Sequence, residues 1–374
     1  MQVKVISDIG QLSASKWNKL LTDSNPFCRH EFLSALEIHK CVGEKYGWIP
    51  RHIIVEHKND LVGAAILYEK YNNYGEFVFD HAWHQAYSRY ELNYYPKMVS
   101  AIPYTPANGT RFLVKKGLKD VVFPLIMKKI LEICKTIDAS SFHCLFSNTT
   151  EIDWLRSQDL LFRKDCQFHW NNNNYKSFED FLLSLKSKKR KNIRRERKIV
   201  AESGVTLRKL DGNTASHNDW KNFDNFYQQT FLEKSGIPTL NLAFFEKIAS
   251  TIPNQILLIL ADIDGKCIAG SLMFSSETHL YGRHWGCIEH IDHLHFEACY
   301  YMGIEHCIEN GLQVFEPGAQ GEHKIARGFI PTITESAHMI IDDSFKDAIS
   351  NYCEQEAKYM DKYIEEVNLH SPYK

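Results

Sequence analysis

The stretch ILLILADIDGKCIAGSLMFS, at residues 256–275, consists of an apolar run, a polar turn and a second apolar run. Asp264 and Gly265 supply the turn signal, so the pattern predicts a two-stranded hairpin. The segment IIVEHKNDLVGAA, at residues 53–65, has the same order of strand, turn and strand. We also match residues 74–83 with residues 279–285 as the strands that follow. Repetition of this kind predicts two copies of one fold, related by an ancient duplication.

The remaining predicted elements support two similar halves. A chain of 374 residues exceeds one typical core, and we expect domains at residues 1–165 and 166–374. Strands and helices are assigned from apolar periodicity and from turn and capping signals. In the first half we expect strands at 2–7, 52–56, 61–68, 76–80 and 141–146, and helices at 13–21, 30–39 and 120–136. In the second half we expect strands at 205–210, 255–262, 266–275, 279–286 and 313–316, and helices at 178–203, 219–233, 242–251 and 294–310.

The composition restricts the class of protein. Lys and Arg total 44 against 46 Asp and Glu, a formal charge of -2, so any polyanion site must be local. Hydrophobic residues make up 44% of the chain, which excludes disorder as a description of the whole. The ten cysteines include no CxxC pair, and the first residues do not resemble a secretory leader. This cysteine pattern predicts a protein of the reducing cytoplasm. No stable membrane insertion is expected, because the apolar runs are of strand length.

Several segments carry a resemblance to a known family. The order of the elements is similar to the GNAT acyltransferase fold, occurring twice. Residues 181–198 look like the basic helix that opens the second domain of Fem-type aminoacyltransferases. The segments HFEACYY and FEPGAQGEHKIARGF, together with residues 75–83 and 94–97, resemble a bacterial FemAB-like family of the GNAT superfamily, often labelled peptidoglycan biosynthesis or recognition. The resemblance implies an α/β (α+β) fold of tandem duplicated GNAT domains, each a mixed, mostly antiparallel sheet flanked by helices.

Residues 316–329 contain the candidate catalytic groups. Acyl transfer to an amine requires a cradle for the donor, polarisation of the carbonyl and a base for the ammonium proton. The candidates for the base are Glu316, Glu322 and His323, and Lys324 is the candidate for stabilising the oxyanion. Lys324 also occupies a position similar to the lysine of the Fem-type pattern that ends in Gly-Phe. The alternative is that these charges only cap and solvate a short helix.

The predicted basic helix is a local anion site. Nine of the thirteen residues from 186 to 198 are Lys or Arg. The side chains on its basic face suit phosphates of tRNA or of a nucleotide-linked or lipid-linked acceptor. The alternative is an ordinary solvated surface. The predicted substrate-binding residues are Arg190, Arg194 and Arg197 on this helix, and Arg283, His284, Trp285, Glu297, Gly318, Gln320, Gly321 and Arg327 around the donor cleft.

A further polar and aromatic set occurs in the first half. It either lines an acceptor groove or forms a structural network, and its members are Asp80, His81, His84, Tyr94, Tyr95, Lys97 and Arg111. We expect no metal, because the cluster Cys287, His290, His293, His295 and Cys299 lacks the ligand spacing of a zinc site.

These residues predict an acyltransferase that works by direct attack of the amine, since no Cys-His or Ser-His-Asp signature indicates a covalent intermediate. The resemblance implies aminoacyl-tRNA as the donor and a peptidoglycan precursor or peptide as the amine acceptor, with no further cofactor. It also disfavours coenzyme A, because neither half has a clear copy of the loop that holds its pyrophosphate. The alternatives are an acyl-CoA-dependent N-acyltransferase and a non-catalytic tandem GNAT module that binds nucleic acid or a cell-wall precursor.

Overall fold

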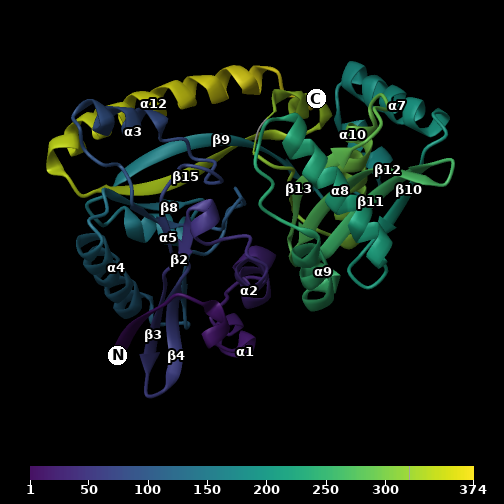
Figure 1. Cartoon of the computed structure of the whole chain (residues 1–374). Coiled ribbons are helices and arrows are strands. Elements are labelled where there is room, and N and C mark those ends of the chain that lie inside the picture. The colour runs from purple at the N-terminus through teal and green to yellow at the C-terminus, as the bar shows by residue number, and fades with distance from the viewer. Residues whose placement is uncertain (320) are drawn as a thin grey trace. The chain divides into compact units, whose positions relative to one another are not determined.

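The computed structural model describes residues 1–319 and 321–374, and the chain forms two compact units (Figure 1). Unit 1 comprises Met1–Cys166 and Ile333–Tyr363, and unit 2 comprises Gln167–Thr332 and Ile364–Lys374. The division falls inside three elements, which are β9 (Leu161–Asn171), β15 (Ile330–Ile340) and α12 (Asp343–Leu369).

Residues 333–363, which the sequence analysis assigned to the second domain, lie in unit 1. Two contacts explain this difference. Strand β15 pairs antiparallel with β8 (Ser141–Leu145). On α12, Glu356 accepts hydrogen bonds from the Arg163 guanidinium at 2.6 and 2.7 Å. These pairings join segments far apart in sequence, which periodicity alone does not reveal.

Unit 1 contains two sets of hydrogen-bonded strands. One is an antiparallel sheet in the order β1-β3-β4-β7, and the other runs β15-β8-β6-β5-β2 with one parallel pair, β6 with β8. Helix α4 (Lys119–Thr136) contacts strands of both sets and completes their core. The other bounds are β1 Gln2–Ile6, α1 Ala14–Asn18, α2 His30–Ile38, β2 Trp48–Pro50, β3 His52–His57, β4 Asp60–Ala65, β5 Tyr68–Lys70, α3 His81–Arg89, β6 Lys97–Ser100, β7 Phe112–Val114 and α5 Thr149–Leu155.

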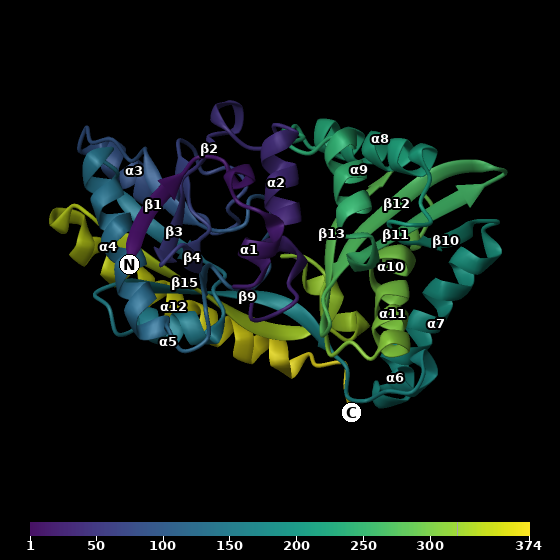
Figure 2. The ribbon, with the colours of Figure 1, turned by 90° about the horizontal axis from the view of Figure 1, so that it is seen from below.

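Unit 2 is built on strands in the order β10-β11-β12-β13-β14-β9, of which only the β13–β14 pair is parallel among the described pairings. Figure 2 shows α8 and α9 on one face of this sheet and α10 and α11 on the other. The predicted mixed, mostly antiparallel sheets flanked by helices are confirmed. The bounds are α6 Phe178–Ser184, α7 Ser187–Glu202, β10 Thr206–Leu210, α8 His217–Glu233, α9 Leu242–Thr251, β11 Ile256–Ile263, β12 Lys266–Ser275, β13 His279–Cys287, α10 Leu294–Phe296, α11 Met302–Asn310 and β14 Val314–Glu316.

Among the predicted elements, the strand at 61–68 is divided into β4 and β5, the helix at 294–310 contains a π-helical turn, and two further elements differ as follows. The single helix over residues 178–203 is divided into α6 and α7, because Leu185 has an extended backbone that ends α6. The prediction of a strand at residues 76–80 is wrong. The match of residues 74–83 with β13 therefore fails over these residues. This segment is irregular and leads into α3, since its carboxylates turn inward to a buried lysine.

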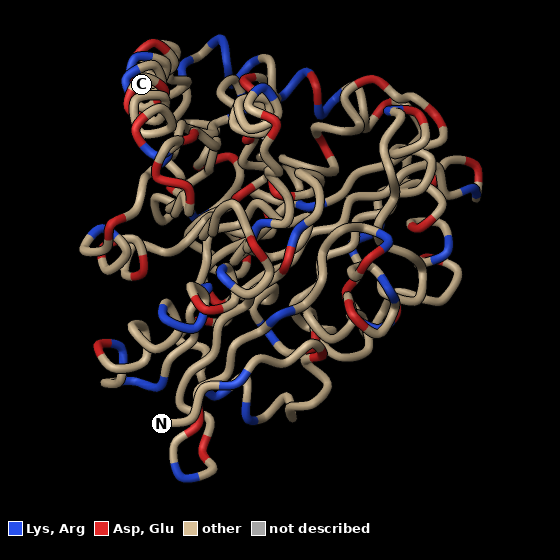
Figure 3. Tube along the Cα trace, turned by 60° about the vertical axis from the view of Figure 1, so that its left-hand side comes forward, with Lys and Arg blue, Asp and Glu red and all other residues tan. Residues whose placement is uncertain are grey.

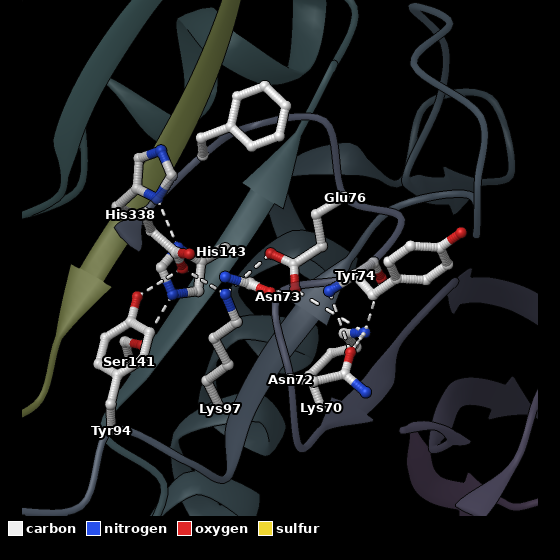
Figure 4. A network of polar contacts seen from close by, with 12 residues as sticks. Lys70, Asn72, Asn73, Tyr74, Glu76, Tyr94, Lys97, Ser141, His143 and His338 are labelled. Carbon is white, nitrogen blue, oxygen red and sulfur yellow. Dashed lines mark hydrogen bonds and ion pairs between the residues drawn. The ribbon is translucent and has the colours of Figure 1, made fainter. Parts of the chain in front are cut away.

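That lysine, Lys97, is the centre of a buried polar network in unit 1 (Figure 4). Its ammonium donates to Glu76 Oε2 at 2.8 Å and to Asp80, and all three side chains are at most 3% exposed. Tyr94 OH donates to Asp80 Oδ2 at 2.6 Å. Burial alone would lower the pKa of Lys97, but the charges of Glu76 and Asp80 outweigh it and raise that pKa. Asp80 and Lys97 therefore neutralise each other inside the unit.

Two other predicted binding residues of the first half are also engaged within unit 1. Arg111 is fully buried and donates to the backbone carbonyls of Leu145 at 2.9 Å and Ala107 at 2.7 Å. The half-buried ring of Tyr95 packs edge-on against His84. The contacts of Asp80, Lys97 and Arg111 fit the structural alternative for this set.

Figure 3 shows acidic and basic positions interspersed along the trace, in line with the formal charge of -2. Within residues 1–319 and 321–374, no helix combines the length and the apolar character that crossing a membrane requires.

Replacing Lys97 by Met tests the network. We expect the free energy of unfolding to fall by about 3–5 kcal/mol, because Asp80 loses its buried counter-charge and Glu76 keeps only Lys70, whose Nζ lies 3.9 Å away. The measurement is urea denaturation followed by circular dichroism. The matched control is Lys115→Met, which removes a lysine from an exposed pair with Asp60 and is expected to change stability far less. Equal effects of the two variants would contradict a stabilising role for the Lys97 network.

Candidate functional site

The candidate site in unit 2 lies where β13 and β14 part. The two strands pair in parallel only from His279 to Tyr281, and β14 ends at Glu316. Pro317 then follows, and proline has no N–H to donate to a strand ladder. A Cβ on Gly282 would lie 3.1 Å from Pro317 Cα, so glycine permits the close approach of the two segments at this point. From Gly282 onward β13 continues without β14 beside it.

A small hollow opens at this parting. Its volume is about 130 Å³, and it is lined by Ser271, Gly282, Arg283, His284, Trp285, His295, Cys299, Tyr300 and Pro317. The predicted residues Arg283, His284 and Trp285 thus line one hollow. Burial lowers the pKa of Arg283 to about 10, and the charge of Glu316 partly offsets this effect. Burial also lowers the pKa of His284 to about 3, helped by the charge of Arg283.

Lys324 lies next to this hollow, on the short helix η6 (Glu322–Arg327). Its side chain is nearly enclosed, with the residue 2% exposed, and its Nζ donates to the Gly318 carbonyl at 2.7 Å. Burial lowers the pKa of Lys324 to about 8, and Cys299 in the hollow wall acts in the opposite direction. A lysine with two N–H groups left after bonding one carbonyl can donate to an oxyanion while it is charged.

His323 and Tyr300 form a hydrogen-bonded pair at the same place. His323 Nε2 lies 2.9 Å from Tyr300 OH, and Tyr300 lines the hollow. His323 is an exposed residue, but partial desolvation and the charges of Lys324 and Arg327 lower its pKa below the usual 6.5. The imidazole is therefore neutral at pH 7 and can accept a proton that reaches it through the Tyr300 hydroxyl.

Arg327, at the end of η6, makes its contacts with other residues of the protein. Its guanidinium donates to Glu196 of α7 at 2.9 and 3.0 Å and to the His323 carbonyl at 2.8 Å. The guanidinium carbon also lies 3.4 Å from the centre of the Phe296 ring. Glu196 accepts a further hydrogen bond from Tyr301. These contacts give Arg327 a positioning role for η6.

The basic helix α7 has an outer and an inner face. Lys186, Lys188, Lys191, Arg194, Arg195 and Lys198 are exposed. Arg194 pairs with Glu179, and Arg190 is half-buried. Arg197 points inward, where it pairs with Glu297 at 2.8 Å and Glu305 at 2.6 Å. Arg197 and Glu297, both predicted to bind substrate, therefore contact each other.

The other predicted residues are placed as follows. Glu316 is buried at the end of β14, and Glu322 is exposed on η6. Gly318 supplies the carbonyl that Lys324 contacts, and Gly321 precedes η6 with a φ of 118°. Gln320 lies outside the described residues. Among the residues that the structure describes, no group of His, Cys, Asp or Glu is arranged to hold a metal ion.

Tyr300 and Ser271 were not among the predicted site residues, and no role for His295 in the wall of a hollow was predicted. Cys299 Sγ donates to Ser271 Oγ at 3.4 Å, so helix and sheet meet across the hollow. Tyr300 and Cys299 belong to η5 (Glu297–Tyr301), a π-helical turn between α10 and α11. π-Helical turns often occur at functional sites because they re-aim side chains, but apolar periodicity does not reveal them.

Comparison with solved structures shows the fold. The crystal structure of FemX is 12% identical with a TM-score of 0.54, covering 94% of this chain and 100% of that chain. The C-terminal domain (DUF2156) of a putative lysylphosphatidylglycerol synthetase from Agrobacterium fabrum is 9% identical with a TM-score of 0.53, covering 92% and 95%. The structure of L-PGS from Bacillus licheniformis is 9% identical with a TM-score of 0.51, covering 89% and 97%.

The sequence itself matches a family of known description. No curated protein matches the chain. The profile of the FemAB-like family, described as peptidoglycan biosynthesis/recognition, matches residues 8–374. This match covers nearly the whole chain and agrees with the resemblance seen in residues 181–198 and 315–329. The chain therefore belongs to the FemAB-like family.

Proposed function

We propose that this protein transfers an acyl or aminoacyl group from an activated ester or thioester to an amine in peptidoglycan metabolism. The observation that carries the proposal is the hollow at the parting of β13 and β14, beside which lie a buried lysine and a Tyr300–His323 pair. The family description supports a peptidoglycan precursor or peptide as the acceptor.

In the proposed reaction the amine nitrogen attacks the carbonyl carbon of the donor directly. The new N–C bond forms and the C–O or C–S bond to the carrier breaks, and the carrier leaves as an alcohol or thiol after it gains a proton. Charged Lys324 donates a hydrogen bond to the oxyanion. The ammonium proton passes to Tyr300, whose own proton passes to His323. Glu316 and Glu322 stay as the alternative bases.

Aminoacyl-tRNA is the proposed donor. Five exposed Lys and Arg side chains lie on α7 and a sixth, Lys186, directly precedes it, in a protein whose formal charge is -2. Exposed cations on one helix attract a polyanion by releasing its counterions. An acyl-CoA thioester is the alternative donor. Both donors and cell-wall precursors occur in the cytoplasm, which we propose as the location.

The pH dependence tests the role of Lys324. We expect kcat/KM to fall as the pH rises through about 8, because Lys324 then loses its proton. The rate is also expected to fall below the lowered pKa of His323. Lys324→Ala is expected to reduce kcat by about 10²–10³-fold while donor binding survives. Lys324→Arg keeps the charge and is expected to move the alkaline limb upward.

Tyr300→Phe tests the proposed proton path, because it removes the hydroxyl that passes the proton to His323. It is expected to reduce kcat by about 10²-fold or more. Transfer is measured by mass spectrometry of the acceptor at several pH values. Unchanged activity of both Lys324→Ala and Tyr300→Phe would show that this site is not the catalytic one.

The outer face of α7 is tested with the triple variant Lys188→Gln, Lys191→Gln and Arg195→Gln. We expect weaker binding of aminoacyl-tRNA and a slope of log K against log salt that is smaller by about 2–3. The matched control removes three exposed lysines of unit 1, Lys116, Lys128 and Lys135, and is expected to leave tRNA binding unchanged. Saturable transfer from acyl-CoA with none from aminoacyl-tRNA would eliminate the tRNA donor.

A further inference from the structure

A second hollow of unit 2 adjoins the candidate site. Its volume is about 360 Å³, and we call it the side pocket; it is lined by Trp285, Cys287, Glu289, His290, Ile291, Asp292, His293, Leu294, His295 and Phe296. Trp285 and His295 line both hollows, and their ring centres lie 5.3 Å apart. The ring pair is therefore a wall common to the two hollows, and a substituent on a carbonyl in the smaller hollow would enter the side pocket by passing it.

The wall of the side pocket is mainly apolar. Trp285, Cys287 and Ile291 pack on the hydrophobic cluster that contains Leu294, which is 1% exposed. Burial lowers the pKa of His295 to about 4, so this ring is neutral at pH 7. Trp285 and Phe296 are half-buried, and their aromatic rings contribute to the wall of the side pocket. Such a wall favours apolar groups, because their transfer from water is favourable and no buried charge is created.

The charges around the side pocket argue against the phosphate-bearing carrier. Glu289 and Asp292 belong to its lining, and the described lining residues include no Lys or Arg. Lys266 pairs with Glu289 at 2.7 Å, so these two charges offset each other. The described lining therefore offers no Lys or Arg for the phosphates of tRNA or coenzyme A, which are polyanions. The part of the donor that is left to occupy the side pocket is the transferred group, which lies on the other side of the reacting carbonyl from the carrier.

We infer that the side pocket binds an apolar side chain of the transferred aminoacyl or acyl group and so selects the donor. This inference rests on the proposed function. A cavity of about 150 Å³ can hold a benzene ring, so the side pocket has room for a branched aliphatic or aromatic side chain. A glycyl or acetyl group would leave it almost empty.

Ile291→Phe, which narrows the side pocket, tests the inference in the full chain. We expect the wild type to prefer leucyl over glycyl donors, and the variant to lose about tenfold or more of that kcat/KM ratio. Cys287→Leu is a second, milder variant with the same expected direction. The matched control is Ala201→Phe, which fills a separate hollow of about 330 Å³ that shares no lining residue with the side pocket. It is expected to leave the ratio unchanged.

Binding is measured independently of turnover, by saturation-transfer NMR with leucinamide, glycinamide and lysinamide. Binding of leucinamide that Ile291→Phe abolishes, with no transfer from any donor, would support the side pocket and reject the proposed function. Transfer with a ratio that neither variant changes would overturn the inference and leave the proposed function intact. A preference for lysyl donors would also overturn it, since the acidic residues would then be the selective feature.

Discussion

The parallel pairing of β13 and β14 over three residues is the constraint on which the rest of unit 2 depends. Longer pairing would fill the edge of β13 with backbone hydrogen bonds and leave no space beside it. Pro317 ends the ladder, and Gly282 lets the two segments pass without a clash. The strands part as a result, and side chains of η5 line the hollow beside β13, with His323 of η6 bonded to one of them. The hollow in which we propose that the reaction occurs therefore exists because the pairing of β13 and β14 is short.

Two buried lysines, Lys97 of unit 1 and Lys324 of unit 2, differ in the groups that surround their ammonium. In unit 1, Lys97 has two carboxylates within reach, and they raise its pKa above the usual value despite burial. In unit 2, Lys324 donates to a backbone carbonyl, and burial lowers its pKa to about 8. The first lysine is locked in its charged form, whereas the second changes its charge near neutral pH. Burial also lowers the pKa of Lys70 in unit 1, to about 7, so it is the position of Lys324 beside the hollow, together with its lowered pKa, that suits it to a reaction.

Local patterns predicted much of the fold. The hairpin at residues 256–275 could be identified because its apolar runs and its Asp-Gly turn lie close together in the chain. The basic helix and the Glu316–Phe329 segment could be identified as candidate sites from charge density and from resemblance. The pairing of β15 with β8 joins residues nearly two hundred positions apart, and no local pattern encodes it. The composition of the irregular segment before α3 predicts a strand. The segment is irregular because its carboxylates turn inward to Lys97, which lies elsewhere in the chain.

The candidate site could also be predicted only in part, because some of its residues form a local pattern and others do not. Lys324 and His323 lie in a conspicuous polar segment, whereas Tyr300 is one aromatic residue among many on a helix. Its hydrogen bond to His323 depends on the π-helical turn, which changes the direction of side chains by part of a turn. Arg197 and Arg327 were predicted to contact substrate because they are cationic. The structure supplies their partners from η5, α11 and α7, which the sequence alone does not bring together.

The buried ion pair between Glu196 and Arg327 has a mechanical consequence. Glu196 is on the same helix as the exposed cations, and Arg327 is three residues after Lys324. A shift of α7 that η6 did not follow would separate two enclosed charges, at a large cost in free energy. The helix that faces solvent and the turn that carries the lysine must therefore move together as one rigid piece.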